Sequence, residues 1–239
     1  MAKMKIVVWD LPLRLFHWLL VVSFSIAYVT AEISGLWLVW HEMIGLFIIS
    51  LILFRVIWGF VGSEYSRFSH FLPTPKRIEQ YYLTDESPVG HSPLGALSVF
   101  TLLIVVFSVA CLGLFSLNDD AEFYGPFYDL VNADWVERLT IWHAQLFDVS
   151  LIFIVLHILA ILFYLFYKKN NLIYPMITGV RHIPGKFRRS PDRYAKVNHL
   201  LTAIVISIFV FWILQSGFLV SWILSNSINS TQEINSPSW

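Results

Sequence analysis

Five long apolar runs are separated by shorter polar segments along the chain. They cover about residues 11–31, 36–60, 94–117, 141–167 and 199–224. Each run has the roughly 20 residues that a helix needs to cross the hydrocarbon core of a bilayer. Because backbone polar groups must find partners within lipid, each run predicts a transmembrane helix. The pattern therefore predicts an all-α, polytopic membrane helix bundle.

The runs group into three regions. Residues 1–179 hold the first four helices and form a predicted four-helix core. Residues 180–224 hold a basic loop and a fifth transmembrane helix. Residues 225–239 form a tail rich in Asn and Ser, and such a polar composition is typical of disorder.

Composition agrees with lipid as the solvent. Hydrophobic residues make up 57% of the chain, charged residues only 13%, and the mean hydropathy is +0.67. The formal net charge of zero gives no case for a nucleic-acid partner. The single cysteine, Cys111, cannot form a disulfide framework, and no Cys-x-x-Cys-His motif for covalent haem is present.

Lys and Arg are distributed unevenly between the two sides of the predicted bundle. Of the 16, all except Arg138 fall on the side that holds the N-terminus. By the positive-inside rule this side is cytoplasmic, and after five crossings the C-terminus is periplasmic. The loop of residues 118–137, on the other side, contains acidic residues and no Lys or Arg. Simple solvation explains this loop, and a docking surface for a basic partner is the alternative.

Four histidines lie inside or at the edge of the predicted helices: His17, His41, His143 and His157. His143 and His157 share one helix face, about 40° apart, and are separated by about 21 Å along the axis. The first predicted helix runs outward, so His17 lies in its inner half, at the depth of His157. The second runs inward, so His41 lies at its outer edge, at the depth of His143. Paired histidines on facing helices are how a bundle holds a planar macrocycle axially. The pattern therefore predicts two haem b groups, one at each depth.

Other roles for these histidines are packing and hydrogen bonding between helices. Four histidines at two matched depths are harder to explain in that way. Zinc is a weaker alternative, because its ligands must converge and two residues 21 Å apart, by the roughly 1.5 Å rise per residue, cannot do so.

Three arginines are candidates for binding the anionic haem propionates. Arg14 precedes His17 by three residues, and Arg55 returns to the cytoplasmic depth of the second helix. We expect both at the inner haem and Arg138, five residues before His143, at the outer haem. The alternative for Arg14 and Arg55 is that they anchor the topology and extend to the interface.

Several segments together resemble a known family. In chain order they are VWDLPLRLFHW from Val8, HEMIG from His41, RVIWGFVG from Arg55, RFSHF from Arg67, GHSPLGA from Gly90, WH at Trp142 with His157, and MITG from Met176. Over about residues 8–179 the chain is similar to the bacterial cytochrome b-561 family, which includes the cytochrome b subunits of membrane-bound Ni,Fe-hydrogenases. The resemblance implies two b haems ligated by His17, His41, His143 and His157. The fifth helix departs from the simpler members, and it could cover the haem face, bind a partner or help to form a quinone pocket.

The resemblance also implies a function. We expect a protein of the bacterial inner membrane that transfers electrons between the quinone pool and a periplasmic redox partner. That partner would be a c-type cytochrome or a hydrogenase-like enzyme. The chain would then be an electron-transfer protein or a subunit of a quinol-linked oxidoreductase, with no catalytic side chain of its own. A non-redox membrane anchor and a transporter are the alternatives, and both predict a colourless protein.

Overall fold

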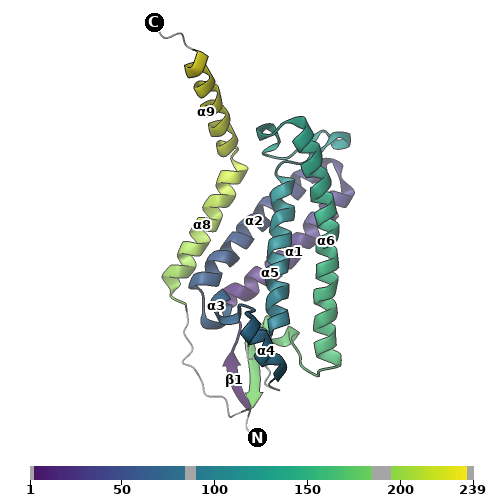
Figure 1. The fold of residues 1–239 in the computed structure, drawn as a ribbon, viewed down its shortest axis with the longest axis vertical. Helices are drawn as coiled ribbons and strands as arrows, with labels where there is room; N and C mark the ends of the chain where they lie inside the picture. Colours follow the sequence, from purple (N-terminus) through teal and green to yellow (C-terminus); the bar gives the residue numbers. More distant parts are fainter. Residues whose placement is uncertain (1–2, 84–89, 185–194, 236–239) are drawn as a thin grey trace.

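The computed structural model describes residues 3–83, 90–184 and 195–235. Five helices in these ranges are long and apolar enough to cross a membrane. They are α1 (Leu11–Ile33), α2 (Leu38–Val61), α5 (Pro93–Gly113), α6 (Ala133–Phe166) and α8 (Val197–Gln215). Figure 1 shows α1, α2, α5 and α6 as one bundle with α8 beside α2. The chain is a multi-pass membrane protein, as the apolar runs predicted.

Polar caps fix where three of these helices begin. Asp10 accepts a hydrogen bond from the backbone N–H of Leu13 at 2.9 Å, and Ser92 accepts one from Gly95 at 3.1 Å. Proline follows in the first turn of both helices, where its missing N–H costs nothing. Asn132 caps α6 in the same way. The helix α6 therefore begins at Ala133, earlier than the predicted residue 141, and the end of the predicted acidic loop is helical.

The C-terminal region differs from the prediction. Helix α8 ends at Gln215, Gly217 adopts a left-handed φ of 65°, and a further helix, α9 (Phe218–Asn235), follows. Helix α9 thus runs into the tail that was expected to be disordered, as far as Asn235, and residues 236–239 lie outside the described ranges. The apolar start of α9 supplies the helical turns from which the polar residues extend, and extension costs far less than nucleation.

A small sheet that the sequence did not predict joins the two ends of the four-helix core. Strand β1 (Lys3–Val7) pairs antiparallel with β4 (Val180–Pro184), so that Val7 lies opposite Val180. The short helix α7 (Ile173–Thr178) precedes β4 and ends at Gly179, whose φ of 81° suits glycine. The Gly179 carbonyl accepts from the N–H groups of Val8 and Trp9.

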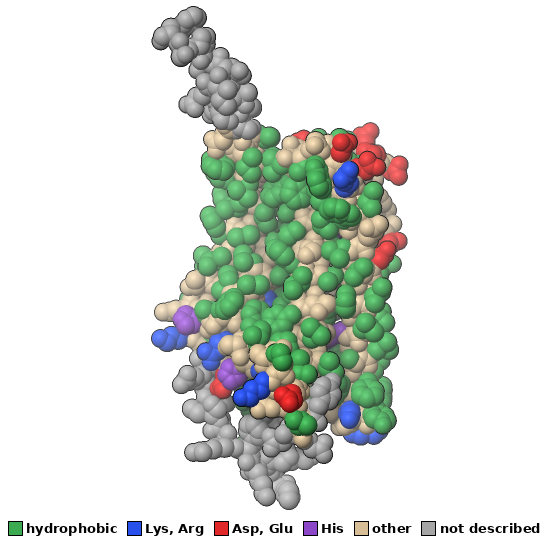
Figure 2. Space-filling view, in the orientation of Figure 1, with side chains coloured by type: hydrophobic (Ala, Val, Ile, Leu, Met, Phe, Trp, Pro, Cys, Tyr) green, Lys and Arg blue, Asp and Glu red, His purple; other side chains and the backbone are tan. Residues whose placement is uncertain are grey.

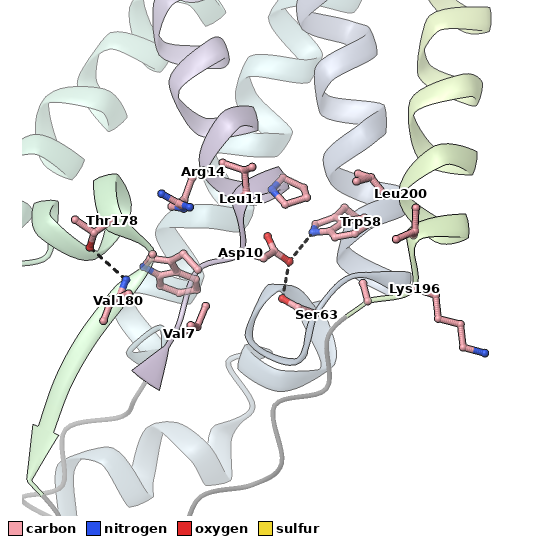
Figure 3. A pocket seen from close by; sticks show the side chains of 15 residues that line it. Val7, Asp10, Leu11, Arg14, Trp58, Ser63, Thr178, Val180, Lys196 and Leu200 are labelled. Carbon is pink, nitrogen blue, oxygen red and sulfur yellow. Dashed lines mark hydrogen bonds between the residues drawn. The ribbon is translucent and has the colours of Figure 1, made fainter. Parts of the chain in front are cut away.

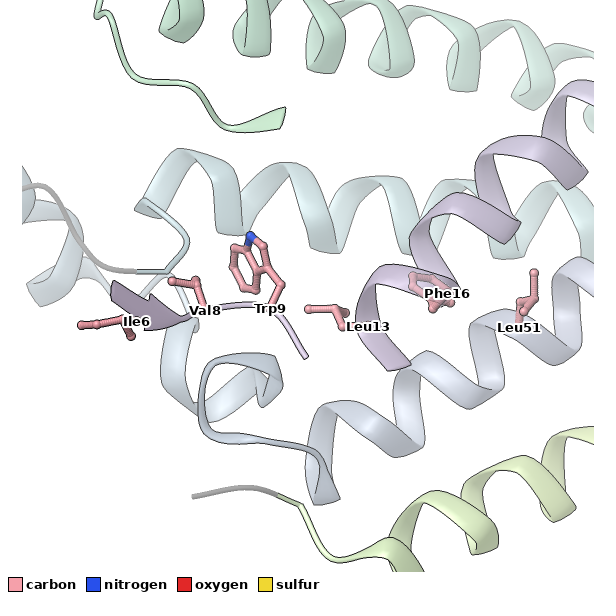
Figure 4. Close-up of a cluster of buried hydrophobic side chains, with 6 residues drawn as sticks. All are labelled: Ile6, Val8, Trp9, Leu13, Phe16 and Leu51. Atoms are coloured by element: carbon pink, nitrogen blue, oxygen red, sulfur yellow. The ribbon is translucent and has the colours of Figure 1, made fainter. Parts of the chain in front are cut away.

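Hydrophobic clusters hold the helices together. One cluster packs the start of α1 against α2 and includes Val8, Trp9, Leu13, Phe16 and Leu51 (Figure 4). A second packs α2 against α5 through Ile48, Ile52 and Val106. A third joins α2 to α8 through Leu46 and Leu214. Helix α2 is therefore central to the packing.

The remaining segments form the two ends of the bundle. At one end lie η2 (Glu64–Ser66), α3 (Phe68–Phe71) and α4 (Pro75–Leu83). At the other lie η1 (Gly35–Trp37), β2 (Leu117–Asn118), η3 (Asp119–Ala121), β3 (Phe123–Tyr124) and η4 (Tyr128–Leu130).

Charge separates these ends, with apolar side chains between them (Figure 2). We call the first the basic end, defined by Arg14, Arg67, Lys76, Arg77, Lys168 and Lys196. We call the second the acidic end, defined by Asp119, Asp120, Glu122, Asp129, Asp134 and Glu137.

Candidate functional site

Two of the predicted histidines face each other near the acidic end. His41, from α2, and His143, from α6, have ring centroids 6.1 Å apart and perpendicular planes. Nδ1 of His41 lies 2.8 Å from the Ala27 carbonyl, and Nδ1 of His143 lies 2.8 Å from the Val109 carbonyl. A carbonyl oxygen only accepts, so each Nδ1 carries a proton and donates. Nε2 is therefore the ring nitrogen of each histidine that is left for another partner.

This geometry fits two axial ligands of one metal ion. Metal–imidazole bonds of about 2 Å, plus the offset from each ring centre to its nitrogen, place the centroids about 6 Å apart. The hydrogen bonds at Nδ1 are the outer contacts that usually orient a ligating histidine. Among the described residues, no group of three or more His, Cys, Asp or Glu side chains could hold a metal ion. A macrocycle such as haem is one group that supplies the remaining ligands of an ion held by two histidines.

Glycines leave space beside this pair. A Cβ at Gly113 would lie 3.0 Å from Cε1 of His143, so only glycine permits this ring position without displacement. A Cβ at Gly45, one turn after His41, would meet no described atom within 4 Å. These positions allow a flat group to approach the two rings closely.

The second predicted pair lies nearer the basic end. His17 of α1 and His157 of α6 are close enough to interact electrostatically. Nδ1 of His157 lies 3.3 Å from Oγ of Ser98, whereas Nδ1 of His17 is buried without a hydrogen bond to any described residue. The structure thus brings the rings of His41 and His143 into contact, whereas His17 and His157 are linked only by an electrostatic interaction.

An aromatic stack lies between the two depths. Phe147, one turn after His143, stacks on Phe24 at 5.8 Å and on Tyr28 at 5.6 Å, with nearly parallel planes. Both partners belong to α1, so this stack joins the α1–α2 pair to α6. No sequence signal distinguishes these residues, because aromatic side chains are common throughout the apolar runs.

The three predicted arginines lie in different environments. Arg55 is only 2% exposed, and its guanidinium carbon lies 4.5 Å from the centre of the Phe68 ring. Arg14 donates from Nη1 to the carbonyl of Ile177. Arg138 is exposed and lies over the ring of Trp135 on its own helix. No contact described in the structure joins Arg138 to His41 or His143, so its expected role there gains no support.

A pocket of about 370 Å³ opens at the basic end between the starts of α1 and α8 (Figure 3). Asp10 and Arg14 line it, with Trp58 from α2 and Lys196 and Leu200 from the start of α8. Its walls are mainly apolar, and Arg14 lies one turn before His17 on α1. The fifth helix therefore contributes to a pocket beside the core.

Comparisons with known proteins agree with this arrangement. The family model described as prokaryotic cytochrome b561 matches residues 8–179. The probable Ni/Fe-hydrogenase B-type cytochrome subunit of Bradyrhizobium diazoefficiens is 24% identical over 215 residues, covering 75% of this chain and 87% of that protein. The protein of the same name from Azotobacter vinelandii is 25% identical over 172 residues, covering 60% and 68%. No solved structure matches significantly.

The family match covers the four-helix core and all four histidines. A probable Ni/Fe-hydrogenase 1 B-type cytochrome subunit of Escherichia coli is also similar, with 24% identity over 151 residues, 50% of this chain and 64% of that protein. The match ends at Gly179, before α8. The chain therefore belongs to the prokaryotic cytochrome b561 family, whose members are membrane electron-transport proteins with haem b.

Proposed function

We propose that this protein is a membrane electron carrier that holds two b haems, one between His41 and His143 and one between His17 and His157. The observation that carries the proposal is the His41–His143 pair, with centroids 6.1 Å apart and Nδ1 of both rings already bonded to carbonyls. When bound, haem iron supplies one-electron redox chemistry. Residues 1–179 are the proposed haem-binding core.

The side chains have distinct tasks in this proposal. The carbonyls of Ala27 and Val109 fix the ring orientation of the ligands and make Nε2 more basic. Arg55 and Arg14 provide positive charge for haem propionates at the basic end. The stack around Phe147 packs α6 against α1 between the two depths.

We further propose that the protein exchanges electrons between membrane quinone and a periplasmic partner, either a c-type cytochrome or a hydrogenase-like enzyme. The names of the relatives support a hydrogenase-like partner. The pocket beside Arg14 offers a place for a quinone head group, with α8 as one wall. The charge distribution supports an inner-membrane protein with a cytoplasmic N-terminus and a periplasmic C-terminus.

The haem content of the purified protein tests this proposal. We expect a reduced-minus-oxidised spectrum of b type and two haems per chain by pyridine assay. His143→Ala removes one ligand and should leave about one haem per chain, since a single imidazole cannot replace the paired ligation. His182→Ala, at an exposed position in β4, is the matched control and should keep both. A colourless wild-type protein would instead support a membrane anchor or a transporter.

A further inference from the structure

Buried nitrogen atoms without hydrogen-bond partners gather at one end of the described structure. They are Nε of Arg14, Nδ1 of His17, Nη1 and Nη2 of Arg55, Nε of Arg67, and Nδ1 of His91. None of these residues belongs to the acidic end, where Nδ1 of both His41 and His143 is bonded. Because buried polar groups are normally hydrogen-bonded, such a concentration of nitrogen atoms indicates a binding site for an acceptor group.

Arg55 is the strongest feature of this site. Its side chain is almost fully buried, yet neither Nη atom has a hydrogen-bond partner among the described residues. Asp10 attracts it electrostatically, but the Asp10 carboxylate already accepts bonds from Trp58 Nε1 and Ser66 Oγ. The contact with Phe68 compensates the charge only in part. A buried cation in this state carries an uncompensated desolvation cost and therefore favours an anion beside it.

His91 shares an aromatic neighbour, Phe71, with this cation. Its ring is held between Trp9 and Phe71, each with a centroid distance of 4.4 Å, and the Arg55 guanidinium lies 6.0 Å from the same Phe71 ring. Burial lowers the pKa of His91 to about 3, with further lowering by the positive charges of Arg55 and Arg77 and by His157. The imidazole is therefore neutral, has one N–H to donate, and lies in a region of positive potential near His157.

We propose that Arg55 and His91 bind a propionate carboxylate of the haem held by His17 and His157. The proposal rests on the proposed function, and it adds His91 to the haem site. A carboxylate has two oxygens, which match a guanidinium with free Nη atoms and an imidazole N–H. The aromatic rings of Trp9, Phe68 and Phe71 position the two donors, which explains why His91 sits in an apolar sandwich rather than in water.

Potentiometric titration of the purified, haem-loaded protein tests the inference. His91→Phe keeps an aromatic ring in the stack and removes the donor, so the carboxylate charge is less compensated and the ferric state is favoured. We expect the reduction equilibrium of one haem to shift three- to tenfold toward the oxidised form, where tenfold is about 59 mV for one electron. Arg55→Gln should shift the same haem in the same direction, and Arg55→Lys should restore part of the shift.

Two further measurements identify the group that is bound. The affected haem should be the one that remains in His143→Ala, and its propionate bending band in resonance Raman spectra should move in His91→Phe. His182→Phe, which changes an exposed histidine at the basic end, is the control and should affect neither haem.

The inference is overturned if both potentials and the Raman band stay unchanged in a protein that still holds two haems. It is also overturned if the shift appears only in nanodiscs of phosphatidylglycerol and not of phosphatidylcholine, since the donors would then bind the head group of an anionic lipid. A colourless wild-type protein would instead refute the proposed function itself.

Discussion

At the scale of single residues, hydrogen bonds to buried acceptors determine the geometry of the core. The Asp10 carboxylate caps α1 through Leu13 and accepts from the side chains of Trp58, Ser63 and Ser66. It thereby joins the start of α1 to the end of α2 and to η2. The carbonyls of Ala27 and Val109 have an equivalent effect on His41 and His143.

Asp10→Ala should destabilise the protein strongly. The change removes a helix cap and leaves Nε1 of Trp58 without its acceptor. We expect a loss of about 3 kcal/mol in unfolding free energy, since hydrogen bonds to charged groups contribute most. Thermal unfolding in detergent measures the effect, with the exposed Asp134→Ala as the control. Equal midpoints for the two variants would contradict the role assigned to Asp10.

Gly113→Ala should disturb the haem near the acidic end. The added methyl would lie 3.0 Å from Cε1 of His143 and 3.2 Å from its Nδ1, while the bond to the Val109 carbonyl restrains the ring. The ring must tilt or the bond must break. We expect a changed spectrum or reduced occupancy of that haem alone, measured by the pyridine assay and low-temperature spectra. Ser108→Ala on the same helix is the control, and an unchanged spectrum in Gly113→Ala would count against the site.

At the scale of elements, the capping residue in the sequence determines where a helix begins, but it does not determine which helix packs against it. The caps of α1, α5 and α6 are visible as Asp, Ser and Asn before a helical run. The position of α6 relative to α1 depends on side chains that meet across the bundle, above all the stack of Phe147 with Phe24 and Tyr28.

Phe147→Ala should loosen α6 against α1. Loss of the ring removes two stacked contacts that both come from α1, and we expect a cost of about 2 kcal/mol for this partly buried side chain. Phe147→Leu should recover much of that stability. Unfolding midpoints measure the change, with Phe209→Ala as the control because Phe209 is 56% exposed. A larger effect in the control would show that the stack does not join the helices.

At the scale of the whole molecule, α2 is the centre and α8 is an addition to one side of it. The buried face of α8 is formed by Ala203, Ser207 and Leu214. The family match ends before this helix, and all four candidate ligands lie within the matched region. Helix α8 therefore adds a wall to the pocket at the basic end and contains none of the four candidate ligands.

Removal of residues 197–239 should leave both haems bound. The exposed face of α2 would then contact lipid, which is as apolar as the helix it replaces. We expect an unchanged haem-to-protein ratio and a lower thermal midpoint. Loss of either haem from the truncated protein would show that α8 supports ligation, contrary to the division into core and addition.

The sequence alone determined the five crossings, the two depths of the histidines and the separation of charge between the ends. These features follow from local composition and helical periodicity, because lipid forces each apolar run to be a helix. Only the tertiary structure revealed the bonds of His41 and His143 to carbonyls, the β1–β4 sheet, and the Phe71 ring that His91 and Arg55 share as a neighbour. Backbone acceptors have no residue signature, and contacts between distant segments depend on how the helices pack.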